Sequence, residues 1–122
     1  MERERFEDLV EKAVDSLPPQ FQERLNNIVV LVEDWPSREQ YRKVGLHSRQ
    51  DLLGLYEGIP LTDRDSGYNM VLPDRVTIFQ RPIEMICLTD EEIVRRVSET
   101  VRHEIAHYFG ISDSRLREIG RD

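Results

Sequence analysis

Apolar residues recur at helical spacing in the first part of the chain. In residues 3–17 the apolar positions lie three or four residues apart, and charged residues stand between them. These positions are Phe6, Val10, Ala13, Val14 and Leu17. This pattern predicts an amphipathic helix over residues 3–16, with its charged residues on a solvated face. Pro18-Pro19 end that helix, and because proline suits the first turn of a helix, residues 19–26 are predicted to form a second, short one.

The next segment changes to a short, continuous apolar run. Ile28-Val29-Val30-Leu31-Val32 is rich in β-branched residues and has no polar position. Such a run is typical of a strand covered on both faces, so we expect a central strand here. After it, Ser37-x-x-Gln40 has the form of a capping box and predicts a short helix that ends near Val44, before Gly45.

Three further segments have strand patterns. Residues 52–57 predict a second strand, which Gly58-Ile59-Pro60 ends. Residues 68–72 and 75–79 flank Pro73-Asp74, where proline followed by aspartate favours a tight turn, and we therefore expect a hairpin. Together with the helices, these strands predict an α+β fold with a small sheet.

The clearest helix signals lie in the last third of the chain. Thr89-x-x-Glu92 forms a capping box, Leu88 and Ile93 occupy the positions of a hydrophobic staple, and Gly110 stands where a left-handed cap is expected. These signals predict a helix over residues 90–109. At 100° per residue its apolar residues fall on one stripe, and two histidines fall on the opposite side. The stripe comprises Ile93, Val94, Val97, Val101, Ile105 and Tyr108.

Composition narrows the class of protein. A chain of 122 residues is expected to form one domain, residues 1–122. Its net charge of −7 argues against binding to nucleic acid, metal-dependent RNA processing included, and against adsorption to anionic lipid. The longest apolar run, residues 28–32, is far too short to span a membrane. A lone cysteine, Cys87, and a start without a signal peptide suit a cytoplasmic protein.

The C-terminal helix carries the candidate chemistry. Its end reads His103-Glu104-x-x-His107-x-x-Gly110-x-x-Asp113. Histidines at i and i+4 project one turn apart and can bind one zinc ion, Asp113 can supply a third ligand, and a fourth position is left for water. Glu104 can then accept a proton from metal-activated water that attacks a carbonyl.

Other interpretations of these residues remain open. A histidine pair at this spacing also occurs on solvated helix faces without any metal. Asp113 can instead cap a last short helix over residues 114–119, and Glu118 is then the reserve ligand. Histidine with carboxylate suits Zn²⁺ but does not exclude other transition ions.

The motif, together with Gly58-Ile59-Pro60-Leu61 and Leu72-Pro73-Asp74-Arg75, resembles the small bacterial zincin-like metallopeptidase family over nearly the whole chain. The resemblance implies a minimal zincin-like fold, in which a small mixed β-sheet packs against the HExxH helix. It also implies zinc held by His103, His107 and Asp113, with Glu104 as the general base of peptide-bond hydrolysis. The substrate would be a peptide or protein.

In zincins generally, an edge strand above the cleft pairs with an extended substrate. The resemblance assigns this strand to five residues, Tyr68, Asn69, Met70, Val71 and Leu72. Full-length metzincins continue into a lower subdomain with a Met-containing turn, whereas here nine residues follow Asp113 and every methionine lies upstream. A partner chain or a second copy would then complete the cleft. The alternative function is a non-catalytic zinc-binding regulatory or protein-interaction module.

Overall fold

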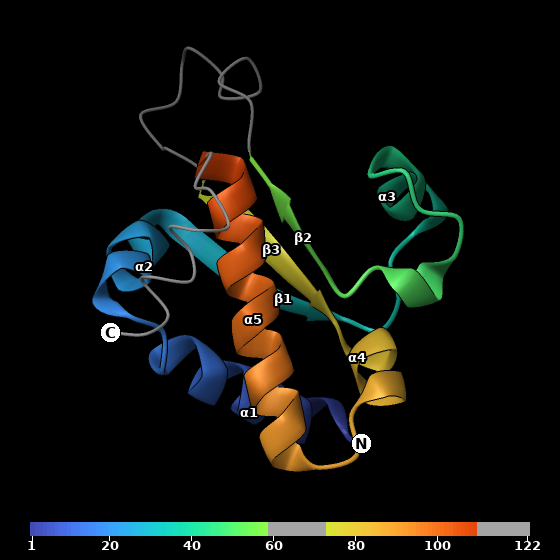
Figure 1. Ribbon diagram of the computed structural model, residues 1–122, viewed down its shortest axis with the longest axis horizontal. Coiled ribbons are helices and arrows are strands. Elements are labelled where there is room, and N and C mark those ends of the chain that lie inside the picture. Colours follow the sequence, from blue (N-terminus) through green and yellow to red (C-terminus); the bar gives the residue numbers. More distant parts are fainter. Residues whose placement is uncertain (59–72, 110–122) are drawn as a thin grey trace.

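A computed structural model describes residues 1–58 and 73–109, without the side chain of Phe109 (Figure 1). Its helices and strands combine into an α+β fold, as the sequence predicts. In chain order the elements are α1 (Arg3–Asp15), α2 (Pro19–Arg24), η1 (Leu25–Asn27), β1 (Ile28–Glu33), α3 (Arg38–Lys43), η2 (Arg49–Asp51), β2 (Gly54–Glu57), β3 (Asp74–Phe79), α4 (Gln80–Ile86) and α5 (Asp90–Phe109). No helix of the described part is long and apolar enough to cross a membrane.

The described strands form a mixed sheet in the order β1-β3-β2. β1 pairs parallel with β3, with Val30 opposite Val76, and β2 pairs antiparallel with β3, with Tyr56 opposite Val76. The predicted strand over residues 75–79 is therefore present as β3. Its predicted hairpin partner, residues 68–72, lies outside the described residues.

The prediction that β1 is central and covered on both faces is wrong. Among the strands of residues 1–58 and 73–109, β1 lies at an edge of the sheet, and its exposure alternates along the strand. Val29 is 39% exposed and Leu31 is 41% exposed, whereas Ile28, Val30 and Val32 pack against the core. The central strand is β3, in which Val76 to Phe79 are all buried. A run without polar residues does not reveal which of its faces is covered, and strand order decides this.

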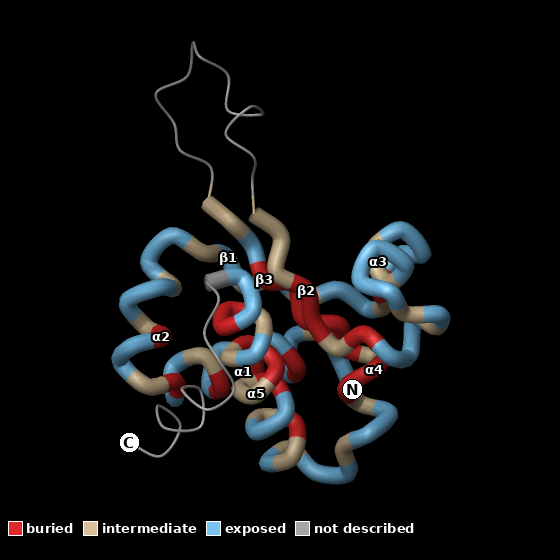
Figure 2. Tube along the Cα trace, turned by 45° about the horizontal axis from the view of Figure 1, so that its top comes forward, coloured by how far each residue is buried: buried red, intermediate tan, exposed pale blue. Residues whose placement is uncertain are grey.

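The main core lies between one face of the sheet and helices α1 and α5. Its members are buried residues of α1, α2, β3, α4 and α5 and of the turn between α1 and α2: Phe6, Val10, Ala13, Leu17, Phe21, Val76, Ile78, Ile83, Ile93, Val97, Val101, Ile105 and Ala106. Figure 2 shows these buried stretches gathered inside the molecule, between the exposed outer faces of the helices. The apolar stripes predicted for α1 and α5 therefore account for most of this core.

A second, smaller cluster forms beside η2 and α3. Leu52, Leu55 and Phe79 are buried there, and Tyr41 and Leu46 pack against them. The predicted capping box is present, since Gln40 N–H donates to Ser37 Oγ at 3.1 Å and Ser37 N–H donates to Gln40 Oε1 at 2.8 Å.

Helix α5 begins where the sequence predicts but lacks the predicted staple. Glu92 N–H donates to Thr89 Oγ1 at 3.1 Å, and the Glu92 carboxylate accepts from Leu88 N–H at 2.8 Å. Leu88 itself is 93% exposed, so it does not pack on Ile93. The cap therefore depends on its hydrogen bonds alone.

Helix α5 runs along β2 at close range. A Cβ atom on Gly54 would lie 2.6 Å from Thr100 Cγ2, and one on Gly58 would lie 2.8 Å from the Tyr108 hydroxyl. Between these two glycines, the Tyr56 N–H donates to Glu104 Oε1 at 2.9 Å. Two residues of a strand advance about 6.6–6.8 Å and four residues of a helix about 6.0 Å. Every second residue of β2 therefore stays level with every fourth residue of α5. The glycines therefore allow the approach that sets Glu104 against β2.

We expect Gly54→Ala to lower the free energy of unfolding by about 1–3 kcal/mol, because the added methyl group overlaps Thr100 Cγ2. Urea denaturation measures this change. Thr100→Ser removes that methyl group and keeps the hydroxyl that donates to Arg96 O at 2.7 Å. In a double-mutant cycle, Thr100→Ser should recover part of the loss. Additive effects of the two substitutions would contradict the close approach.

Candidate metal centre

His103 and His107 lie one turn apart on α5, and both are exposed. Their ring centroids are 6.3 Å apart and the ring planes meet at 60°. One tetrahedral ion ligated at about 2.0–2.1 Å by a nitrogen of each ring would hold the two centroids about 5 Å apart, so a rotation of these exposed side chains brings both rings onto a single ion. Within residues 1–58 and 73–109, neither imidazole makes a hydrogen bond or an ion pair. Both rings therefore fit the ligand role that the motif predicts.

Glu104 stands between the two histidines in sequence but faces β2. Leu53 O accepts from Phe79 N–H at 2.9 Å. In an antiparallel pair the residues of a strand alternately face the partner strand and point away from it with their backbone N–H groups. The Tyr56 N–H, three residues after Leu53, therefore points away from β3. Glu104 Oε1 accepts that N–H at 2.9 Å. Burial raises the pKa of Glu104, while this hydrogen bond and the nearby His107 and His103 act to lower it. The carboxylate is thus oriented by backbone and partly removed from water.

Tyr56 is itself held at two points. Its hydroxyl donates to Asp74 Oδ2 at 2.8 Å, and its ring stacks on that of Tyr108 with centroids 4.0 Å apart and planes 22° apart. Burial, followed by the Asp74 carboxylate, raises the pKa of Tyr56, which stays a neutral donor. The backbone N–H that orients Glu104 therefore belongs to an anchored residue.

Tyr108 does not belong to the buried stripe of α5 as predicted. It is 51% exposed, and it lies over β2, where it stacks on Tyr56. The reason is its phase on the helix, because Tyr108 follows Thr100 and Glu104 at intervals of four residues. The side chains of this series face β2, and the core receives those of Val101 and Ile105.

A groove of about 480 Å³ opens beside Glu104 and His107. One side is α5 and the floor is β2, and the other side is the segment between α3 and η2. The described part of its lining is mainly apolar and comprises Val44, Leu46, Leu52, Leu55, Tyr56, Glu104, His107 and Tyr108. A carboxylate and an imidazole thus share one concave surface, which is the usual setting of a ligand or substrate site.

Several predicted site residues lie outside the described residues. These are the third ligand Asp113, its reserve Glu118, and the proposed substrate strand Tyr68, Asn69, Met70, Val71 and Leu72. Within the described part of the chain, no three His, Cys, Asp or Glu side chains gather into a metal site. The part of the candidate centre that lies within the described residues is therefore the histidine pair with Glu104.

Sequence reasoning missed two parts of this site. Tyr56 contributes through its backbone, which leaves no residue-type signal, although Gly54-x-Tyr56-x-Gly58 hints at a strand approached closely by another element. The groove wall at Val44 and Leu46 has no sequence signal. These residues lie far from the motif along the chain, and only the fold brings them to the same groove.

A protein-family model matches residues 25–121 of the chain. The family is described as zincin-like metallopeptidase. A search of curated proteins found no match. The matched residues include β2, β3 and α5, and hence every described residue of the candidate centre and its groove.

We expect Glu104→Ala to speed hydrogen exchange of the Tyr56 amide about five- to tenfold, because the N–H loses an acceptor worth about 1–1.4 kcal/mol. Glu104→Gln keeps an oxygen acceptor and should leave the exchange rate near that of the wild type. Exchange measured by NMR tests this, with the Thr77 amide of the central strand as an internal reference. Equal rates in all three proteins would contradict the hydrogen bond.

Proposed function

The chain belongs to the zincin-like metallopeptidase family, and from this premise we propose that it is a zinc-dependent peptidase with Glu104 as general base. The observation that carries the proposal is the shared groove, in which Glu104 and His107 line one concave surface. Peptide or protein would be the substrate. The mainly apolar lining and the net charge of −7 give no support to a nucleic-acid substrate.

His103 and His107 are the described residues that would hold zinc, with Asp113 as the predicted third ligand. Their exposed imidazoles suit the metal because each ring keeps a nitrogen available to it. Zinc bound there would supply Lewis acidity, which polarises a carbonyl and lowers the pKa of a bound water to about 7.

Glu104 would move the proton in this reaction. One carboxylate oxygen is held by the Tyr56 N–H, so the other can face the attacking water and accept its proton. The same oxygen can later deliver that proton to the leaving amine. Burial raises the pKa of Glu104, which brings the carboxylate closer to the range in which it both accepts and releases a proton near neutral pH.

The α5–β2 packing would keep this geometry constant. Tyr56 is fixed through Asp74 and Tyr108, so the Glu104 carboxylate returns to one orientation after each turnover. Preorganisation of this kind lowers the cost of reaching the transition state, because the base need not be reoriented.

We expect His103→Ala and His107→Ala each to weaken zinc binding by more than about 100-fold. Loss of a residue that only hydrogen-bonds to a ligand weakens binding roughly 10–100-fold, and these substitutions remove the ligand itself. Competition with a chromophoric chelator measures the affinity. His47→Ala is the matched control, because His47 is also exposed and, although it belongs to the segment between α3 and η2, it is not among the described residues that line the groove. Equal affinities in all three variants would refute the assignment of the ligands.

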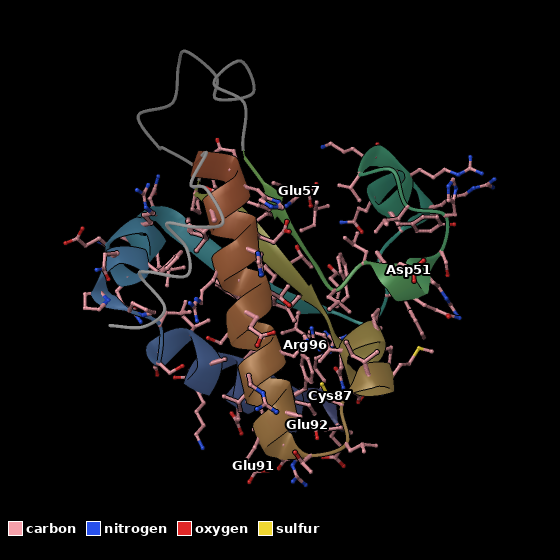
Figure 3. The ribbon with its side chains drawn as sticks, viewed as in Figure 1. Asp51, Glu57, Cys87, Glu91, Glu92 and Arg96 are labelled. Atoms are coloured by element: carbon pink, nitrogen blue, oxygen red, sulfur yellow. The ribbon has the colours of Figure 1, made fainter. Side chains whose placement is uncertain are left out.

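We expect Glu104→Gln to lower peptide hydrolysis by at least about a hundredfold while zinc content stays constant, because the amide cannot accept the proton. Cleavage of a broad fluorogenic peptide library by zinc-loaded protein measures this. Glu91→Gln is the control, since Glu91 is exposed near the opposite end of α5 (Figure 3).

Hydrolysis that survives in Glu104→Gln would remove Glu104 from the mechanism. A wild-type protein that binds zinc but cuts no peptide in the library would overturn the peptidase proposal. That outcome would favour the alternative function, a non-catalytic zinc-binding module.

A further inference from the structure

The groove beside Glu104 has a preformed apolar wall. Val44 follows the last turn of α3 and is 44% exposed, although it is a large apolar residue. Gly45 has φ +83°, a left-handed conformation that favours glycine, and it turns the chain there. Gly45 N–H donates to Arg42 O at 3.0 Å and Leu46 N–H donates to Tyr41 O at 2.9 Å. Backbone hydrogen bonds thus hold Val44 and Leu46 at the groove.

The floor of the groove is also apolar and well supported. Leu52 and Leu55 are buried, and they pack with Phe79, which is fully buried. Among the lining residues in the described part of the chain there is no lysine or arginine, and Glu104 is the one acidic side chain. An ionic side chain placed on this floor would lose water without gaining a partner, which is costly. An apolar side chain would gain about 25 cal/mol for each Å² that it buries.

The position of the groove relates it to the proposed reaction. Glu104 and His107 line the same surface as Val44 and Leu46. Successive Cα atoms of a peptide are 3.8 Å apart, so a side chain seated in this groove belongs to a residue close to the bond that Glu104 would act on. The volume of about 480 Å³ lies within the usual range of ligand pockets, about 300–1,000 Å³.

Building on the proposed function, we propose that the groove binds an apolar side chain, such as leucine or phenylalanine, of the substrate residue adjacent to the scissile bond. Val44 and Leu46 determine this preference. The substrate class is thus peptides with an apolar residue beside the cleaved bond. The specificity comes from the segment between α3 and η2, which lies more than fifty residues before the motif in the sequence.

Two series of peptides test the preference, one varied on each side of the cleaved bond and both otherwise constant. With zinc-loaded protein, kcat/KM for Leu and Phe in one series should exceed that for Ala and Glu by about 10–200-fold. Val44→Lys should reduce the Leu-to-Glu ratio at least tenfold. Because the ratio is internal to each variant, a general loss of activity does not affect it.

Val29→Lys is the matched control. Val29 is likewise a partly exposed valine, on the edge strand β1 and outside the groove, so it should keep the wild-type ratio. Cleavage without an apolar preference, or the same ratio in Val44→Lys as in the wild type, would overturn this inference and leave the peptidase proposal standing.

A binding measurement separates the groove from catalysis. Methyl NMR spectra of zinc-loaded Glu104→Gln are recorded during titration with acetyl-Ala-Leu-Ala-amide or acetyl-Ala-Glu-Ala-amide. The leucine peptide should shift the methyl signals of Val44 and Leu46 and leave those of Val29 unchanged, whereas the glutamate peptide should shift none. This result supports the groove even if no peptide is hydrolysed, which would refute the proposed function alone. Equal responses to both peptides, or no response, would refute the groove assignment.

Discussion

The close packing of α5 along β2 is the constraint on which the candidate site depends. Gly54, Tyr56 and Gly58 meet Thr100, Glu104 and Tyr108 in turn, two strand residues for each helical turn. A Cβ atom at Gly54 would force Thr100 or the strand to shift, and one at Gly58 would displace the Tyr108 ring. Since a helix advances 100° per residue, this contact also sets the direction of every other side chain on α5.

Three faces of α5 follow from that one contact. Val101 and Ile105, one position after the residues on β2, enter the core. His103 and His107, one position before Glu104 and Tyr108, are turned away from it and are exposed. The histidine pair is therefore presented to solvent by the same packing that buries Glu104 against a backbone N–H. Rotation of the helix by one residue would turn His103 and His107 toward β2 and move Thr100 and Glu104 toward the core.

The environment of Glu104 balances two opposing effects. Burial disfavours its charge and raises its pKa, whereas the Tyr56 N–H and the neighbouring histidines favour the charge. Burial of a carboxylate opposes folding, and carboxyl groups with shifted pKa values cluster at functional sites. The apolar groove next to it also opposes folding, since Val44 remains 44% exposed on a turn held by backbone hydrogen bonds. Both features oppose folding, and the proposed function depends on both.

Local chemistry alone determined much of this protein. The caps at Ser37 and Thr89 and the 3.6-residue period of α1 and α5 were readable because each depends on residues within a turn or two. The spacing of His103, Glu104 and His107 likewise depends only on helix geometry. The family that the motif indicated is the one whose model matches residues 25–121.

Only the tertiary structure decided the rest. The edge position of β1, the place of Tyr108 on β2, the backbone donor of Tyr56 and the wall at Val44 each depend on a partner distant in sequence. The apolar run of β1 fits an edge or a central strand equally well, and a tyrosine suits a buried stripe or an aromatic stack. Such residues are compatible with several environments, and strand order and helix rotation select one of them.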